Sequence, residues 1–199
     1  MDAVRVALLR EVLAGTEWLG ATRRFAGALR GSVVNHGGGL LLLGTPEYEP
    51  WHLAAHLVDE ATWSGTPELA PTLVRHGARP TDPAHLAAGL GRIGAARRGE
   101  TLLVVAPAAS APLLDHVHTA RRAGVTVLAL SATADDALTA MAHETLTVPD
   151  GAELDLDTVQ HLVSAATGEN GPSPRARRRF RDRLSRLAET VTAPPPTPW

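Results

Sequence analysis

The sequence contains neither cysteine nor lysine among its 199 residues. The absence of cysteine excludes disulfide bonds, thiolate metal sites and a cysteine nucleophile. The absence of lysine excludes a catalytic Schiff base and the lysine of a phosphate-binding P-loop, since all 19 basic side chains are arginine. Covalent catalysis through either of these two side chains is therefore ruled out.

Net charge and long hydrophobic runs are also scarce. The formal net charge of −2 gives no overall field that would attract nucleic acid or a membrane surface. The longest apolar run, Leu40–Leu43, is far shorter than the roughly 20 residues that cross a bilayer. The first residues include Asp2 and alternate charged with apolar side chains, which is not the pattern of a signal peptide. We expect a cytoplasmic protein with no membrane partner.

The length and composition are those of one globular domain with an appendage. Hydrophobic residues make up 44% of the chain and charged residues 20%, which is typical of folded proteins. A domain holds about 150 residues on average, so the length favours a single domain. We predict an α/β domain over residues 1–170 that includes N-terminal helices within 3–35. A break at 171–174 separates it from an arginine-rich helix and a proline-rich tail over 171–199.

The arginine-rich segment allows two interpretations. Residues 175–186 contain seven arginines, a density that would favour phosphate contacts and a nucleic-acid-associated regulator. Phe180 is the single aromatic residue there that could stack on a base, and the rest of the chain is acidic. A solvated helix packed on the chain's own acidic surface is the simpler interpretation, so nucleic acid is not an expected partner.

Short apolar runs and helical patterns alternate from residue 40 onward. The helical stretches are 51–62, 82–98, 112–123, 135–143 and 156–166, and a further one at 22–34 precedes the first strand. A repeated strand–helix order predicts a three-layer α/β sandwich with a mainly parallel sheet of about five strands. The predicted strands are Leu40–Leu43, Pro71–Val74, Thr101–Val105, Val125–Leu130 and Thr145–Val148.

One stretch of the sequence resembles a known domain. Residues 99–130 contain a strand, a loop with Ser110, a helix ended by Gly124 and a second strand. Together with the strand, glycine turn and histidine-bearing helix of residues 39–57, this order resembles the SIS (sugar isomerase) domain family, in particular its phosphoheptose isomerase branch. The resemblance covers about residues 3–168. It implies the SIS fold, a homodimer or homotetramer, and a phosphorylated sugar as ligand.

The resemblance also implies where a phosphorylated sugar would bind. In SIS domains, hydroxyl groups and backbone amides at a helix N-terminus hold the phosphate, because unpaired amides and the helix dipole favour an anion there. The position of Ser110 matches a hydroxyl of that loop. Polar residues after a parallel strand lie at the carboxyl edge, where α/β sheets bind ligands. The predicted phosphosugar-binding residues are Ser110, Ala111, Thr45, Ser131 and Thr133.

Two histidines on one helix indicate a metal site. His52 and His56 are four positions apart, so their rings project from one helical face at the spacing of helical zinc sites. The resemblance implies a metal at this place, and imidazole ligands without sulfur suit zinc, nickel or copper, with zinc the first choice. The alternative is a pair of partly exposed histidines that are hydrogen-bonded to water. The predicted ligands are His52, His56, Gln160 and His161, with Glu49 and Glu60 as candidate carboxylates.

Several positions differ from the family pattern. His56 stands where the phosphoheptose isomerase branch has a glutamate that serves as acid–base, and Gly168 stands where it has a histidine. Ala106, Pro107 and Ala108 replace hydroxyls of the phosphate loop. Two functions therefore remain open. The first is a metal-dependent aldose/ketose phosphate isomerase with His56 as a catalytic residue, and the alternative is a catalytically inactive SIS relative that acts as a sensor, regulator or assembly subunit.

Overall fold

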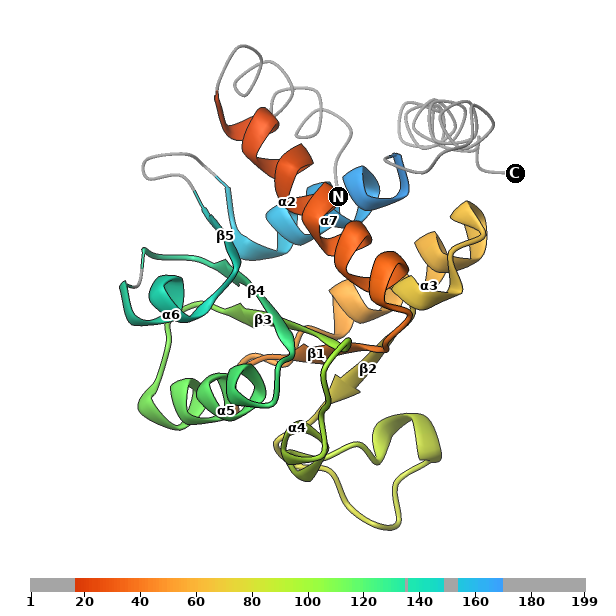
Figure 1. Cartoon of the computed structure of the whole chain (residues 1–199), viewed down its shortest axis with the longest axis vertical. Helices are drawn as coiled ribbons and strands as arrows, with labels where there is room; N and C mark the ends of the chain where they lie inside the picture. The colour runs from red at the N-terminus through yellow and green to blue at the C-terminus, as the bar shows by residue number, and fades with distance from the viewer. Residues whose placement is uncertain (1–16, 135, 149–153, 170–199) are drawn as a thin grey trace, which may run out of the picture.

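The computed structural model describes residues 17–134, 136–148 and 154–169. Helices and strands alternate along this part of the chain (Figure 1). The strands are β1 (Leu40–Leu43), β2 (Pro71–Val74), β3 (Thr101–Ala106), β4 (Thr126–Ser131) and β5 (Glu144–Thr147). The α-helices are α2 (Glu17–His36), α3 (Trp51–Ser64), α4 (Gly91–Gly94), α5 (Ala111–Arg122), α6 (Asp136–Met141) and α7 (Leu156–Glu169), and two 3₁₀ turns are η1 (Pro67–Leu69) and η2 (Ala84–Leu86).

The five strands form one parallel sheet in the order β2-β1-β3-β4-β5. Leu40 of β1 pairs with Pro71 on one side and with Thr101 on the other. All residues of β1 and β3 are buried. Strands covered on both faces need continuous apolar runs and not alternating ones. This is why short runs in the sequence sufficed to predict the strands, and the predicted parallel five-stranded sheet is confirmed.

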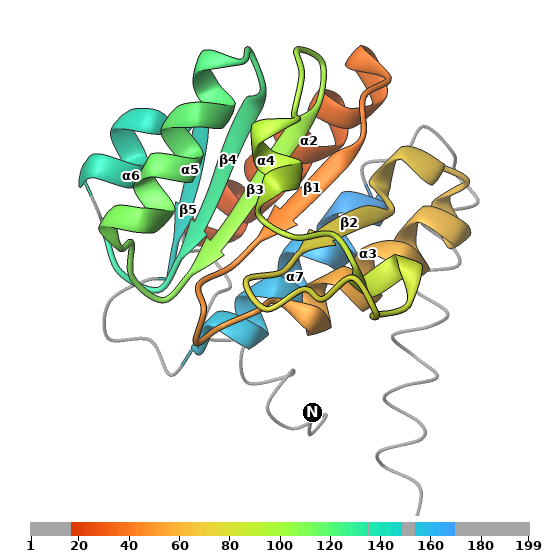
Figure 2. The same cartoon turned by 90° about the horizontal axis from the view of Figure 1, so that it is seen from below.

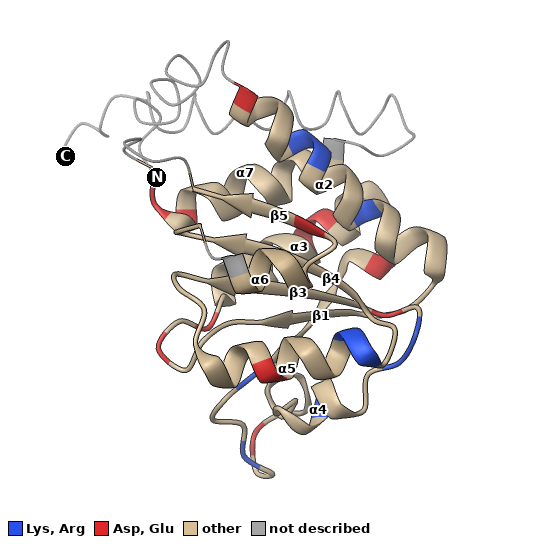
Figure 3. Ribbon diagram, turned by 60° about the vertical axis from the view of Figure 1, so that its left-hand side comes forward, with Lys and Arg blue, Asp and Glu red and all other residues tan. Residues whose placement is uncertain are grey.

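Helices cover both faces of the sheet. Leu40 and Leu42 point into a core shared with α2, α3 and α7, whereas Leu41 and Leu43 point into a core shared with α4, α5 and α6. Figure 2 shows α5 and α6 on one side of the strands and α2 with α7 on the other. Figure 3 shows the same division, with α4 and α5 opposite α2 and α7. The three-layer sandwich predicted from the sequence is therefore confirmed.

One predicted helix is wrong. Residues 82–98 were expected to form a single helix with Asp82 as its N-cap, but the structure has η2, an isolated bridge and the short α4 there. Gly89 forms the bridge with Arg75, and the Asp82 carboxylate accepts a hydrogen bond from that arginine. Glycine inside a helix costs about 1 kcal/mol relative to alanine. With glycines at 89, 91 and 94, the segment lacks the propensity to continue as a helix.

Other predictions fall outside the described residues. The first part of the segment predicted to hold the N-terminal helices lies in residues 1–16, and the arginine-rich helix and proline-rich tail lie in 170–199. The domain boundary near residue 170 and the homo-oligomer therefore stay predictions. Within the described ranges, no helix has both the length and the apolar character that crossing a membrane requires.

Candidate functional site

Helices α3 and α7 lie side by side on the same face of the sheet. The side chain of Tyr48, in the loop before α3, contacts Asp157 of α7, and the ring of His52 contacts that of His161. Each contact joins residues 109 positions apart in the chain. A constant offset is what two neighbouring helices produce when they run in the same direction. Tyr48 and His52, four positions apart, therefore meet Asp157 and His161, one turn apart on α7.

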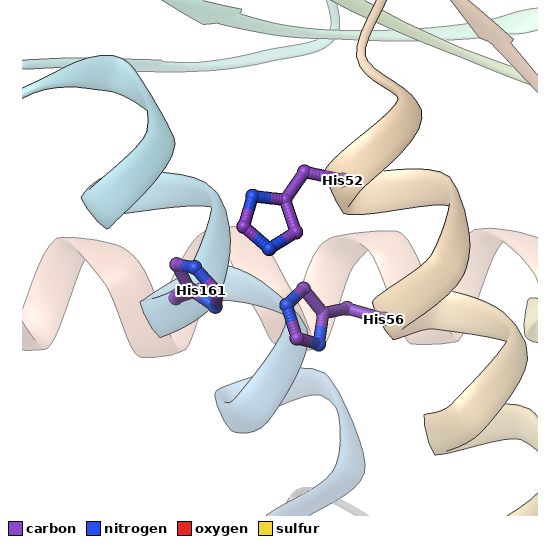
Figure 4. A group of neighbouring side chains, drawn as sticks. All are labelled: His52, His56 and His161. Carbon is purple, nitrogen blue, oxygen red and sulfur yellow. The ribbon is translucent and has the colours of Figure 1, made fainter. Parts of the chain in front are cut away.

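Three imidazole rings meet in the space between these helices. The ring centroids of His52 and His56 are 4.9 Å apart, and those of His161 lie 4.5 Å from His52 and 4.4 Å from His56. One ring nitrogen from each residue can be chosen so that all three lie within 4.8 Å of one another. Figure 4 shows the rings turned toward each other from α3 and α7. We call these three residues the histidine cluster.

The electrostatics of the histidine cluster favour a neutral His161 ring. Burial, followed by the neighbouring His56 and His52, lowers the pKa of His161 to about 4. At neutral pH this ring is therefore uncharged and keeps a nitrogen lone pair. Neutral imidazole is the form that binds a metal ion, whereas the protonated ring repels it.

The donor set fits zinc. Zinc binds imidazole nitrogen at about 2.0–2.1 Å in tetrahedral geometry, which places ligand atoms roughly 3.3 Å apart. The nitrogens of the histidine cluster lie within 4.8 Å of one another, so a small inward rotation of the rings would close the site. Three protein ligands and one open position are typical of a catalytic zinc site and not of a structural one.

Gln160 is buried beside the histidine cluster and holds a different set of contacts. It is 1% exposed, and its amide nitrogen donates to the Tyr48 hydroxyl, the Leu156 carbonyl and the Asp157 carboxylate. Its Oε1 atom has no hydrogen-bond partner in the described part of the chain. Gln160 and His161 are the two adjacent candidate metal ligands on α7, and His161 is the one that belongs to the histidine cluster. The metal-ligand role of Gln160 stays a prediction.

Sequence reasoning missed the contact between Tyr48 and Asp157. The Tyr48 hydroxyl donates a short hydrogen bond to the Asp157 carboxylate. Burial, followed by this hydrogen bond, raises the pKa of Tyr48 far above its ordinary value. The phenol therefore stays protonated at neutral pH and donates its hydrogen bond to Asp157. Nothing in the local sequence signals the pair, because its two members are 109 positions apart.

The predicted phosphate loop lies at the carboxyl end of β3. Ser110 is exposed in extended conformation as the N-cap of α5, and its side chain makes no capping hydrogen bond. Ala111 is the exposed first residue of that helix. Thr133 donates to the Pro107 carbonyl at 3.3 Å and so joins the loop after β4 to this one. The hydroxyl of Ser110 is thus open to a ligand, whereas Pro112, the second residue of α5, has no N–H to donate.

The hydroxyl groups of the other two predicted sugar contacts lie beside polar groups of this chain. Ser131 is buried at the end of β4, where its hydroxyl lies 3.4 Å from that of Thr147. The Thr45 hydroxyl accepts a hydrogen bond from the Tyr48 backbone N–H at 3.1 Å. Their amide and carbonyl groups also pair with each other across this turn. The structure therefore gives Thr45 a role in shaping the turn between β1 and α3.

A second contact that the sequence did not reveal holds the same turn from the opposite side. The Glu49 carboxylate accepts hydrogen bonds from Arg75 Nε at 3.2 Å and from the His76 backbone N–H at 3.0 Å. The Arg75 guanidinium also lies over the Trp51 ring, 4.9 Å from its centroid. Because β1 and β3 are neighbours in the sheet, this turn and the Ser110 loop share one edge of it. Open α/β sheets bind ligands at that edge.

Comparison by sequence finds no match to a protein-family model and none to a curated protein. Comparison by structure finds similar folds at low sequence identity. A proposed sugar-binding protein from Salmonella typhimurium LT2 has a TM-score of 0.56 and 16% identity, with 95% of this chain and 53% of that one covered. This chain therefore spans about half of that protein's length.

Two further structures match over most of both chains. The sugar isomerase domain of an RpiR transcription factor from Sphaerobacter thermophilus has a TM-score of 0.53 and 16% identity, covering 86% of this chain and 93% of that one. A proposed sugar-phosphate isomerase from Listeria monocytogenes has a TM-score of 0.54 and 13% identity, covering 96% and 95%. The fold expected from the sequence is thus confirmed, whereas the phosphoheptose isomerase branch stays a prediction: this chain has the fold of SIS (sugar isomerase) domains.

Proposed function

We propose that this chain binds a phosphorylated sugar at the carboxyl edge of its sheet and interconverts its aldose and ketose forms with the help of a divalent metal, zinc first. The observation that carries the proposal is the histidine cluster, in which three rings from two helices bring nitrogens within 4.8 Å of one another. The names of the similar structures, which include sugar-binding and sugar-phosphate isomerase proteins, support the choice of ligand.

The ligand set for the metal would be His52, His56 and His161. A divalent ion bound there would polarise the carbonyl oxygen of a sugar as a Lewis acid. The chain's own contribution is a set of three ring nitrogens. One of them belongs to His161, whose pKa is held near 4 chiefly by burial. The His161 ring is therefore ready to bind at neutral pH without first losing a proton.

The phosphate would bind at the start of α5. The Ser110 hydroxyl is not used as a helix cap, and Ala111 begins a helix of 12 residues. Unpaired amides and the positive end of the helix dipole favour an anion at this position. Ser110 would donate to a phosphate oxygen, while the metal would sit beside the neighbouring turn between β1 and α3.

The test combines ligand binding with proton transfer. Calorimetry of the zinc-loaded chain against a panel of aldose and ketose phosphates should detect binding that Ser110→Asp abolishes, because the added carboxylate repels phosphate. Thr119→Asp adds the same charge on an exposed position later in the same helix and should leave binding unchanged. Incorporation of solvent deuterium beside the carbonyl, followed by NMR, should accompany isomerisation. Sugar-phosphate binding that survives Ser110→Asp would contradict the proposed phosphate site.

A second candidate function is a catalytically inactive sugar-phosphate sensor or regulator. It is favoured by the packing at Gly168, the position where the family resemblance implies a histidine. A Cβ atom at Gly168 would lie 2.1 Å from Glu60 Oε2, so a side chain there would require the Glu60 carboxylate to move. Binding of a sugar phosphate without any deuterium incorporation would favour this candidate over the isomerase.

A further inference from the structure

The side chains of Tyr48, Asp157 and Gln160 form a closed hydrogen-bonded triangle next to the histidine cluster. The Tyr48 hydroxyl donates to Asp157, and the Gln160 amide nitrogen donates both to that hydroxyl and to Asp157 Oδ1, the latter at 3.0 Å. Tyr48 precedes His52 by four positions, and Asp157 precedes His161 by four. The triangle therefore links the loop before α3 to the first turn of α7, four positions ahead of the His52 and His161 rings.

Both sides of the triangle are attached to rigid structure. Tyr48 is held by the paired turn with Thr45, where its N–H donates to the Thr45 carbonyl at 3.2 Å and its carbonyl accepts at 3.0 Å. The Gln160 amide nitrogen also donates to the Leu156 carbonyl one turn earlier on α7. A hydrogen bond between two such fixed points resists any separation of the start of α3 from α7.

We propose that Tyr48 and Asp157 are positioning residues for the metal site, with Gln160 completing their hydrogen bonds. This inference rests on the proposed function, because it concerns the same histidine cluster. The pair fixes how closely His52 approaches His161, so it determines the size of the site before any ion enters. The Asp157 carboxylate also adds a negative charge one helical turn from His161, which favours a cation there.

The expected effect is on affinity and not on ligand count. Residues that orient metal ligands from outside the coordination sphere typically change metal affinity about 10- to 100-fold when they are replaced. Tyr48→Phe removes the hydroxyl and keeps the ring, and Asp157→Asn keeps the shape and removes the charge. Each variant of the full chain should bind zinc about 10- to 100-fold more weakly than the wild type, with an unchanged stoichiometry.

The experiment is a zinc titration in competition with a chromophoric chelator. It compares the wild type, Tyr48→Phe, Asp157→Asn and the double variant, and each is checked for folding by circular dichroism. Because the two groups act through one hydrogen bond, their effects on zinc affinity should not add. The zinc affinity of the double variant should lie within about twofold of that of the weaker-binding single variant. Thr62→Val is the matched control, since it removes an exposed hydroxyl that bonds to the Val58 carbonyl elsewhere on α3. It should bind zinc as the wild type does.

A spectroscopic readout separates positioning from general stability. Cobalt replaces zinc in nitrogen sites, and its visible absorption bands report the ligand geometry. The bands should shift in Tyr48→Phe and in Asp157→Asn, and they should stay close to the wild-type spectrum in Asp157→Glu, which keeps a carboxylate for the Tyr48 hydroxyl. If Asp157→Asn does not fold, the zinc affinities and cobalt spectra of Tyr48→Phe and Asp157→Glu still test the positioning role.

The outcomes distinguish this inference from the function on which it rests. Wild-type zinc affinity together with an unchanged cobalt spectrum in Tyr48→Phe overturns the positioning role and leaves the metal site intact. Fully additive effects of the two substitutions also overturn it, because they show that the groups act independently. Absence of zinc binding by the wild-type chain overturns both the metal site and the positioning role.

Discussion

The ring of His161 stands edge-on to the ring of His56, with centroids 4.4 Å apart and planes inclined by 62°. The two residues come from different helices, α7 and α3, so their meeting depends on how these helices pack. Together with His52 they form a group of nitrogen donors that no single segment of the chain contains. The proposed metal site depends on this meeting.

The identity of the third ligand can be tested by replacing two neighbours on α7. His161→Ala removes a ring of the histidine cluster and should weaken zinc binding by more than about 100-fold, beyond the effect typical of residues outside the coordination sphere. Gln160→Ala removes a side chain whose amide nitrogen is hydrogen-bonded to Tyr48, Leu156 and Asp157, and it should weaken binding less. Calorimetric titration measures both. A larger loss for Gln160→Ala would assign the ligand role to the glutamine.

The stability of the metal-free chain should depend on pH through His161. The folded chain holds the pKa of His161 near 4, below its ordinary value of 6.5. The unfolded chain therefore binds more protons between these two pH values, and the free energy of unfolding falls as the pH decreases through this range. Above about pH 6.5 the contribution is complete.

Urea unfolding between pH 4 and 8 checks this dependence, with His161→Gln as the control because glutamine does not titrate. The difference in unfolding free energy between the two proteins should be constant above about pH 6.5. As the pH falls toward the pKa of His161 near 4, the unfolding free energy of the wild type should fall relative to that of His161→Gln. Parallel curves over the whole range would contradict the lowered pKa.

Gly44 is expected to be intolerant of a side chain. A Cβ atom there would lie 2.0 Å from the Tyr48 carbonyl oxygen and 2.7 Å from Pro50 Cδ, so Gly44→Ala would push the turn apart. We expect a loss of about 1–3 kcal/mol in unfolding free energy, the usual cost of overpacking, together with weaker zinc binding through the displaced Tyr48. Gly91→Ala is the control, because nothing lies within 4 Å of its Cβ position. Equal stability of the two variants would disagree with the closed turn.

Arg30 is a buried charge that we expect to support the fold and not the site. Its guanidinium donates to the Thr66 hydroxyl and, at 3.3 Å, to the Thr167 carbonyl near the end of α7. Burial lowers the pKa of Arg30, and the opposite charge of Glu68 counteracts this. Arg30→Ala should reduce the unfolding free energy by roughly 2–3 kcal/mol, because both acceptors lose a charged donor. Urea denaturation measures it, and a change below about 0.5 kcal/mol would show that water replaces the arginine.

Most of the sheet could be predicted because its determinants are local. The run Leu40–Leu43 and the run in β3 are apolar without alternation, which is the pattern of strands buried on both faces. The segment between β2 and β3 could not be predicted in the same way. Its turns are fixed by contacts such as that of Arg75 with Asp82. The periodicity of apolar residues does not predict such contacts.

The candidate site was predictable only in part. The spacing of His52 and His56 fixes them on one helical face, whatever the rest of the fold does. The choice between Gln160 and His161 was not available from the sequence. Adjacent helical residues point about 100° apart, and which of them faces α3 is decided by packing. The contact of Tyr48 with Asp157 is a tertiary contact of the same kind.

The most direct test of the central claim is the stoichiometry of zinc binding to the histidine cluster. Zinc titrated calorimetrically into the chelator-treated full chain should bind at one ion per chain, and His52→Ala, His56→Ala and His161→Ala should each remove that binding event. A stoichiometry near zero for the wild type, or an ion that binds equally well after all three substitutions, would contradict the account.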